Sequence, residues 1–276
     1  MEIKENHMKK LYAIGWAICL FVITQGTAMG GFDLNTLEDM AKAQVSIERL
    51  RKQTPTDWKK IKVKYDILAP LVIETDKNKG LEYDKEIRAA MAACEAGEKV
   101  KVNQQVLAKG LQHVVVLNIH DALDQLGQSD TAGKQVSAMF EGIRPTFTRR
   151  DKDFYDSVPT LEKEADRSLA QISKAGTQVP WTAKKELRDI IDRTYGLCVL
   201  YEIIKVEKLR DSNPASCEVK VKEAEIFYRI IQPRIQKHNP AAHDVVNNML
   251  AAGFDQMAAA TIEAHLNQGL AGITLK

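Results

Sequence analysis

Three polar side chains lie on one stripe of an otherwise apolar segment and are of types that bind metal ions. In "KGLQHVVVLNIHDALDQL", residues 109–126, they are His113, His120 and Asp124. If the segment is helical, His120 and Asp124 are one turn apart and their side chains converge. Imidazole and carboxylate groups bind divalent transition metals. The pattern predicts a metal site at His113, His120 and Asp124, completed by another helix. The alternative is that these residues flank the core stripe and face solvent or a polar neighbour.

A second group of side chains is basic and could receive an anion or a protein partner. It consists of Arg144, Arg149, Arg150 and Lys152, near the expected C-terminal end of a helix. Cations at such an end offset the helix macrodipole. The preferred interpretation of this cluster is therefore structural.

Aromatic and acidic residues that could line a ligand groove occur at Tyr195, Tyr201, Glu202 and Glu207. Such residues are also common on amphipathic helices, so the pattern has low specificity. The sequence contains no nucleophile elbow, phosphate-binding glycine loop, zinc-protease motif or dinucleotide fingerprint. A binding protein is therefore the preferred interpretation, and a catalytic function ranks third among the hypotheses.

The composition indicates which elements must position these residues. Of 276 residues, 45% are hydrophobic and 28% are charged, as in an ordinary folded protein. Only 8 prolines and 15 glycines are present, which favours helices. The net charge of +2 is close to neutral and does not indicate nucleic-acid binding. An all-α fold without nucleic-acid binding is expected.

The first 30 residues have the pattern of a secretory signal peptide. Lys9 and Lys10 precede the apolar run 11–24, and small residues follow it. The run is shorter than the ~20 residues of a bilayer span, although an uncleaved anchor is the alternative. The pattern predicts a periplasmic or secreted protein with no stable membrane span after cleavage. An odd number of cysteines would then remain, compatible with one disulfide or none: Cys94, Cys198 and Cys217.

A proline-containing pattern occurs three times in the chain. Each copy begins with an aromatic residue and, after two variable residues, has Ile or Leu. One variable residue then precedes Pro, and another separates Pro from an apolar residue. Three further variable residues lead to a final Asp or Asn. The copies are "YDILAPLVIETD" (65–76), "FEGIRPTFTRRD" (140–151) and "YRIIQPRIQKHN" (228–239). Copies at domain-sized spacing indicate an internal repeat. We expect each proline to bend the second helix of a three-helix unit.

The surrounding segments predict three such units packed as a helical bundle or repeat array. Their boundaries are 31–98, 99–176 and 177–276, after the signal peptide 1–30. The last unit should end in one helix over about 240–268. The β-prone run "HVVVLNI" lies inside a long helical pattern and is expected to be a buried helix.

The element "IRPTFTRRD" followed by a helix resembles one found in exported helical-bundle proteins of the imelysin and bacterial iron-uptake group. The resemblance rests on Ile143, Arg144, Pro145 and Asp151 and covers about 35 residues. A weaker match occurs at Ile231, Pro233 and Asn239.

The signature Gly-x-His-x-x-Glu of that family is not reproduced. Gly110 and His113 are present, but the histidine is one place late and Val116 occupies the place of the glutamate. The resemblance implies the bundle architecture and a link to metal uptake, and it does not carry over the metal site. The leading hypothesis is an exported, non-enzymatic binding or interaction protein with an unknown protein partner or small ligand. The second is a periplasmic metal-binding accessory to iron or other transition-metal uptake.

Overall fold

The computed structural model describes residues 31–129, 131–175 and 178–276, and within these residues every regular element is helical. The predicted signal peptide 1–30 lies outside the described residues. The α-helices are α1 (Leu34–Leu50), α2 (Trp58–Lys79), α3 (Tyr83–Glu95), α4 (Val100–Asp124), α5 (Ala132–Phe154), α6 (Thr160–Lys174), α7 (Trp181–Leu209), α8 (Pro214–His238), α9 (Pro240–Ala251) and α10 (Ala259–Gly269). The all-α prediction is confirmed for this part of the chain, including the helical assignment of the β-prone run, which lies in α4.

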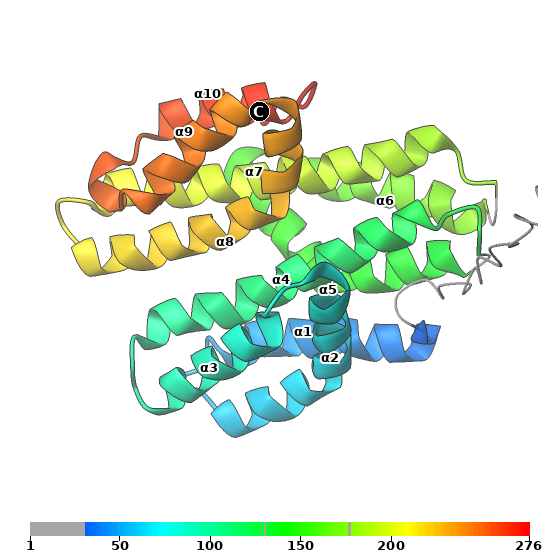
Figure 1. Cartoon of the computed structure of the whole chain (residues 1–276), viewed down its shortest axis with the longest axis horizontal. Coiled ribbons are helices and arrows are strands. Elements are labelled where there is room, and N and C mark those ends of the chain that lie inside the picture. Colours follow the sequence, from blue (N-terminus) through cyan, green and yellow to red (C-terminus); the bar gives the residue numbers. More distant parts are fainter. Residues whose placement is uncertain (1–30, 130, 176–177) are drawn as a thin grey trace, which may run out of the picture.

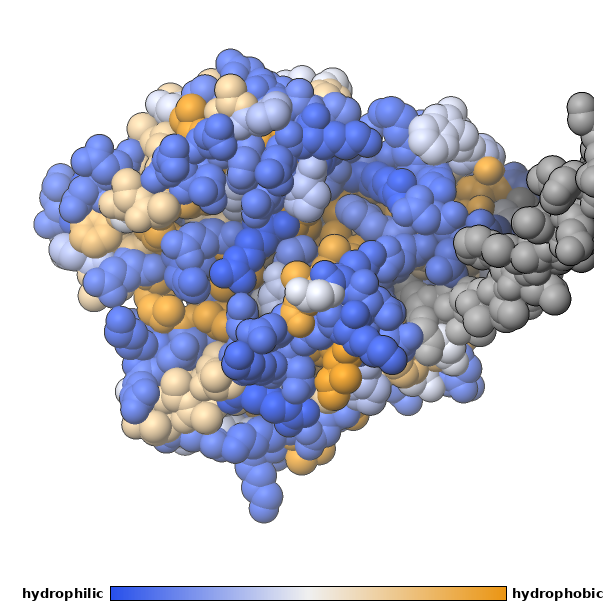
Figure 2. Space-filling view, in the orientation of Figure 1, coloured by the Kyte–Doolittle hydropathy of each residue, from blue (hydrophilic) through white to orange (hydrophobic). Residues whose placement is uncertain are grey.

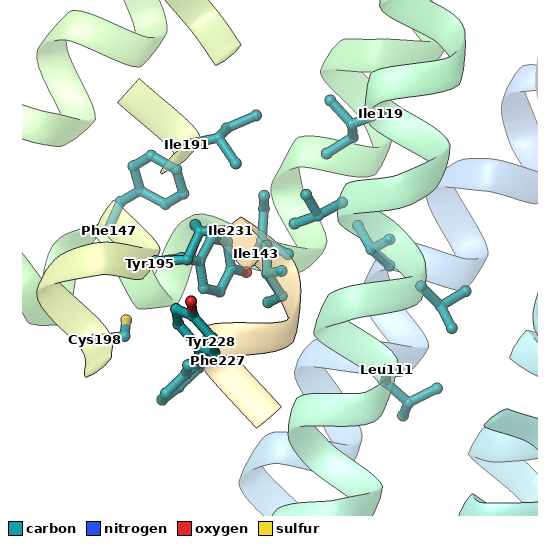
Figure 3. Close-up of a cluster of buried hydrophobic side chains, with 14 of the residues drawn as sticks. Leu111, Ile119, Ile143, Phe147, Ile191, Tyr195, Cys198, Phe227, Tyr228 and Ile231 are labelled. Carbon is teal, nitrogen blue, oxygen red and sulfur yellow. The ribbon is translucent and has the colours of Figure 1, made fainter. Parts of the chain in front are cut away.

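Four long helices form the centre of the molecule. In Figure 1, α4 runs between the group α1–α3 and the group α7–α10. Helix α4 packs against α5 and α8, and α7 closes the set through its contacts with α5 and α8. Figure 3 shows side chains from all four helices meeting in one hydrophobic cluster. Its labelled members are Leu111, Ile119, Ile143, Phe147, Ile191, Tyr195, Cys198, Phe227, Tyr228 and Ile231.

The surface is mainly hydrophilic on the face shown in Figure 2, where hydrophobic residues lie in small groups. None of the described helices combines the length and the hydrophobicity needed to cross a bilayer. The three cysteines beyond residue 30 are free thiols, and all three are buried: Cys94, Cys198 and Cys217.

The repeated proline lies within a continuous helix in each copy: Pro70 in α2, Pro145 in α5 and Pro233 in α8. The aromatic residue that opens each copy is buried. Tyr65 and Phe140 are fully buried, and Tyr228 is 2% exposed. Phe140 and Tyr228 therefore belong to the hydrophobic core.

The last residue of each repeated pattern caps the following helix. Asp151 accepts hydrogen bonds from the backbone N–H groups of Leu161 (2.8 Å) and Glu162 (3.1 Å) in the first turn of α6. Asp76 accepts from the first two N–H groups of α3, both at 2.8 Å. Asn239 accepts from Ala242 in α9 at 3.0 Å. Free N–H groups at a helix start need such acceptors.

Replacing Asp151 with Ala should lower the free energy of unfolding by about 1–2 kcal/mol. Pro159, the N-cap residue just before α6, offers no side-chain acceptor that could replace the lost carboxylate. Asp151→Asn keeps one acceptor oxygen and should lose less. Urea unfolding of both variants tests the expectation, and equal stability of Asp151→Ala and the wild type would contradict it.

The expected single helix over 240–268 is wrong. Helix α9 ends at Ala251, a 3₁₀ turn covers Phe254–Gln256, and α10 begins at Ala259. The break occurs at Gly253, whose φ of 83° belongs to the left-handed region that favours glycine. The chain therefore reverses here, and α10 packs back against α9 and α7.

Candidate functional site

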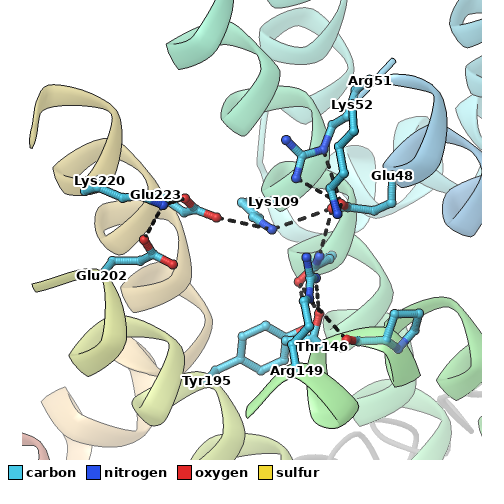
Figure 4. Close-up of polar contacts among 12 residues, drawn as sticks. Glu48, Arg51, Lys52, Lys109, Thr146, Arg149, Tyr195, Glu202, Lys220 and Glu223 are labelled. Carbon is cyan, nitrogen blue, oxygen red and sulfur yellow. Dashed lines mark hydrogen bonds and ion pairs between the residues drawn. The ribbon is translucent and has the colours of Figure 1, made fainter. Parts of the chain in front are cut away.

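A cavity lined by many charged side chains opens among α1, α4, α5, α7 and α8, with a volume of about 410 Å³. We call it the basic cavity because seven Lys or Arg residues line it and only three Asp or Glu residues do. The cations are Arg51, Lys52, Lys109, Arg149, Arg150, Lys152 and Lys220, and the carboxylates are Asp153, Glu202 and Glu223. Figure 4 shows most of these groups converging from separate helices.

The end of α1 supplies a buried ion pair beside this cavity. Arg51 follows Glu48 by three residues, so both lie on one face of the helix. The Arg51 Nη2 atom donates to Glu48 Oε2 at 2.9 Å, and both residues are buried. Burial raises the pKa of Glu48, but the positive charges of Lys109 and Arg51 outweigh it and hold that pKa well below its usual range. Glu48 is therefore a permanent negative charge.

Lys109 is a cation on the buried side of α4 and is only 1% exposed. Its Nζ atom lies 3.6 Å from a Glu48 oxygen and 3.4 Å from a Glu223 oxygen. A charge-assisted N–H···O bond is usually about 2.7–2.9 Å long. The ammonium also lies 4.9 Å from the centre of the Phe227 ring, within cation–π range. Lys109 is thus held electrostatically between two carboxylates.

The opposite wall comes from α7 and α8 and contains two buried carboxyl groups. The Lys220 Nζ atom lies 2.7 Å from Glu202 Oε2 and 3.0 Å from Glu223 Oε2, so the two groups share one ammonium. Burial and the negative charge of Glu223 raise the pKa of Glu202 to about 7 despite Lys220. Lys109 and Lys220 instead lower the pKa of Glu223 against the effect of its burial.

A neutral hydrogen-bond network ties Glu48 to the neighbouring helices. Gln112 Nε2 donates to Glu48 Oε1 at 3.2 Å. The other end of the same amide, Oε1, accepts from Thr146 Oγ1 at 3.2 Å and from the Tyr195 hydroxyl at 3.4 Å. Tyr195 is fully buried. This network fixes α1, α4, α5 and α7 relative to one another beside the basic cavity.

Two cations of the basic cavity are not ion-paired to any carboxylate in the described part of the chain: Arg149 and Lys152. Arg149 uses Nε to donate to the Pro145 carbonyl (3.2 Å) and Nη2 to donate to Thr146 Oγ1 (3.3 Å). These contacts orient the guanidinium, which interacts with the charge of Glu48 but forms no close ion pair with it. Lys152 is exposed, so it lies toward the mouth, whereas Lys109 is buried at the inner end.

A second hollow of about 500 Å³ adjoins the basic cavity across three shared side chains. Lys52, Arg149 and Lys152 line both hollows, and we call these three residues the cationic wall. Loss of hydration and the positive charges of Arg149 and Arg51 lower the pKa of Lys52 despite Glu48. Three cations share this wall, and an anion placed there would be attracted to all three.

The structure distributes the three predicted metal ligands over different surroundings. The buried His113 forms a hydrogen bond through Nδ1 with the Tyr83 hydroxyl of α3. Asp124 forms ion pairs with Lys184 (3.4 Å) and Arg188 (2.8 Å) of α7. Asp124 therefore faces α7, whereas His113 faces α3.

His120 lies between these two residues on α4. The Nε2 atom of His120 has no hydrogen-bond partner among the described residues. Burial lowers the pKa of His113 to about 3 and that of His120 to about 4, so both imidazoles are neutral at pH 7. No group of three or more His, Cys, Asp or Glu side chains in the described ranges is placed to share a metal ion. The metal site at His113, His120 and Asp124 stays a prediction.

The sequence pointed to part of the basic cavity and missed the rest. Arg149, Arg150 and Lys152 belonged to the cluster attributed to the helix dipole, and Tyr201 and Glu202 to the possible groove. All five line the basic cavity. The other charged residues that line the cavity were not recognised: Arg51, Lys52, Lys109, Asp153, Lys220 and Glu223. The available signal was Lys109, a lysine on the apolar stripe of α4.

Comparisons of the chain with protein-family models, with curated proteins and with solved structures found no match. The geometry and charge of the basic cavity are the guide to function.

Proposed function

We propose that this chain is an exported, non-enzymatic helical binding protein whose ligand is a small anion held in the basic cavity. The observation that carries the proposal is the pair of cations without carboxylate partners, Arg149 and Lys152. Charges removed from water are usually paired with an opposite charge, and Arg149 is partly buried without such a pair, whereas Lys152 is exposed at the mouth. The predicted signal peptide supports the periplasmic or secreted location.

The cationic wall suits a carboxylate, sulfate or phosphate group. A guanidinium binds two oxygens of such a group at once, and an ammonium adds a compact point charge. Arg149 keeps N–H donors free after its bonds to Pro145 and Thr146. Lys52 and Lys152 stand on the same wall. The body of a small organic anion would extend toward Tyr201 and Phe227, whose side chains line the cavity.

We also propose that the bundle is built from three three-helix units, 31–98, 99–176 and 177–276. The equivalent prolines in α2, α5 and α8 support this arrangement, as do the caps supplied by Asp76, Asp151 and Asn239. In this arrangement the basic cavity lies where the three units meet, because α1, α4, α5, α7 and α8 all contribute to it.

Sulfate and succinate should bind to the protein lacking residues 1–30, and replacing both Arg149 and Lys152 with Gln should weaken binding about tenfold or more. Each substitution removes a charged donor from the cationic wall while leaving a side chain of similar length. Isothermal titration calorimetry at low ionic strength measures the effect, because added salt screens an exposed part of the site.

The matched control is the double variant Arg49→Gln, Lys163→Gln. Both residues are exposed and neither lines the basic cavity or the adjoining hollow. This control variant also loses one arginine and one lysine charge, but at positions outside the basic cavity, so it should bind both anions as the wild type does. If both double variants lost the same anion affinity, the loss would be due to overall charge and the proposal would be contradicted. Absence of sulfate and succinate binding to the wild type would also contradict it.

A further inference from the structure

Two buried carboxyl groups of the basic cavity depend on one lysine. Glu202 on α7 and Glu223 on α8 are 3% and 7% exposed. Lys220 Nζ contacts one oxygen of each, at 2.7 Å and 3.0 Å. The oxygens can therefore be no farther apart than these two distances added together. Two like charges this close are unfavourable in a dehydrated site unless further cations offset them.

The other cations near these carboxyl groups already have partners. Arg150 of α5 is paired with Asp153 of the same helix. Lys109 of α4 lies between Glu48 and Glu223. Glu223 therefore has two cationic neighbours, whereas the only ion pair of Glu202 within the described ranges is with Lys220. Glu202 is the carboxyl group of the pair with the least compensation.

We infer that the basic cavity binds its anion together with one proton, which is taken up by the Glu202 carboxyl group. This inference rests on the proposed function. The bound anion adds negative charge to a cavity that already contains two close carboxylates. A proton from solvent that bonds to a Glu202 oxygen removes one of these charges, and the same proton leaves when the anion dissociates. Lys220 then remains paired with Glu223.

The direction of the pH dependence follows from linkage. Glu202 already has a pKa of about 7 in the free protein. A nearby anion raises that pKa further, so the bound state carries more protons than the free state. Affinity should therefore be full below about pH 7 and should fall as the pH rises above it. The coupling is absent at low pH, where Glu202 is protonated in both states.

Sulfate is the probe, because it keeps its charge throughout this range and adds no titration of its own. We expect sulfate affinity to fall about tenfold between about pH 6 and about pH 8.5, since one pKa unit corresponds to a factor of ten. Calorimetry in two buffers of different ionisation enthalpy should detect uptake of about half to one proton per sulfate near pH 7.5, and close to none near pH 5.5.

Glu202→Gln should remove both effects. The amide resembles the protonated carboxyl group in shape and stays neutral, so this variant should bind sulfate with the wild-type low-pH affinity at every pH. The matched control is Glu218→Gln, an exposed position on α8 that lines neither hollow. It should keep the wild-type pH dependence and proton uptake.

Two results would overturn the coupling and leave the anion site standing. One is sulfate binding to the wild type with no proton uptake at any pH, a measurement that does not require the variant to fold. The other is an unchanged pH dependence in Glu202→Gln, which would place the proton elsewhere. If the wild type failed to bind sulfate even near pH 5.5, the proposed function itself would fail, and the coupling with it.

Discussion

Replacing Lys109 with Met should lower the free energy of unfolding by about 3–5 kcal/mol, as expected when one member of a buried ion-pair network is removed. Met fills a similar volume, so the loss is electrostatic. Glu48 keeps Arg51 and Lys52 as partners and Glu223 keeps Lys220, but both carboxylates lose the ammonium that lies between them. Chemical denaturation at neutral pH measures the change.

Two further variants separate this explanation from a simple loss of charge. Lys101→Met removes an exposed lysine from the same helix and should change stability by less than about 0.5 kcal/mol. Adding Glu223→Gln to Lys109→Met should restore part of the lost stability, because one uncompensated carboxylate disappears. If Lys109→Met were as stable as the wild type, Lys109 would not be the buried counter-ion described above.

Replacing Phe140 with Ala should also cost about 3–5 kcal/mol, the usual range for a large buried aromatic side chain. Phe140 is fully buried, and its ring meets Phe147 edge to face with centroids 4.8 Å apart. The Arg144 guanidinium lies 5.1 Å from the same ring. Truncation leaves a cavity that these neighbours can fill only partly.

Trp181→Ala provides the comparison for Phe140→Ala. Trp181 is also a large aromatic residue, but it is 68% exposed at the start of α7. Its removal should change the free energy of unfolding by less than about 0.5 kcal/mol. Thermal or denaturant unfolding of the two variants under identical conditions gives the contrast. Similar losses for both would indicate that burial does not determine the cost.

Helix positions were largely predictable because the apolar spacing and the caps agree. The repeated pattern placed Pro70, Pro145 and Pro233 inside helices, and each lies inside one. The break after α9 was missed because Gly253 lies in an alanine-rich segment whose spacing remains helical. Only the positive φ of that glycine shows that the chain turns there.

The basic cavity was less predictable because its charges are brought together by tertiary packing. Arg149 and Lys152 were visible as a local cluster, but their charges were attributed to the helix dipole. Their environment depends on which carboxylates lie nearby. Glu48 reaches the site from α1 and Glu223 from α8, and no local spacing connects these helices.

The predicted metal site shows what helical spacing alone leaves open. A shared stripe on α4 is enough to align His113, His120 and Asp124, but metal binding also depends on what the neighbouring helices contribute. Those neighbours are a tyrosine hydroxyl for His113 and two cations for Asp124. Helical spacing specifies the stripe and does not specify the residues that face it.

The most direct test of the anion site is a crystal structure of the protein lacking residues 1–30, grown with selenate and measured at the selenium absorption edge. We expect an anomalous peak within hydrogen-bond distance of the Arg149 guanidinium in the basic cavity. The same peak should be missing from crystals of the Arg149→Gln, Lys152→Gln variant. Selenate peaks elsewhere on the molecule, with none at Arg149, would show that the basic cavity is not an anion site.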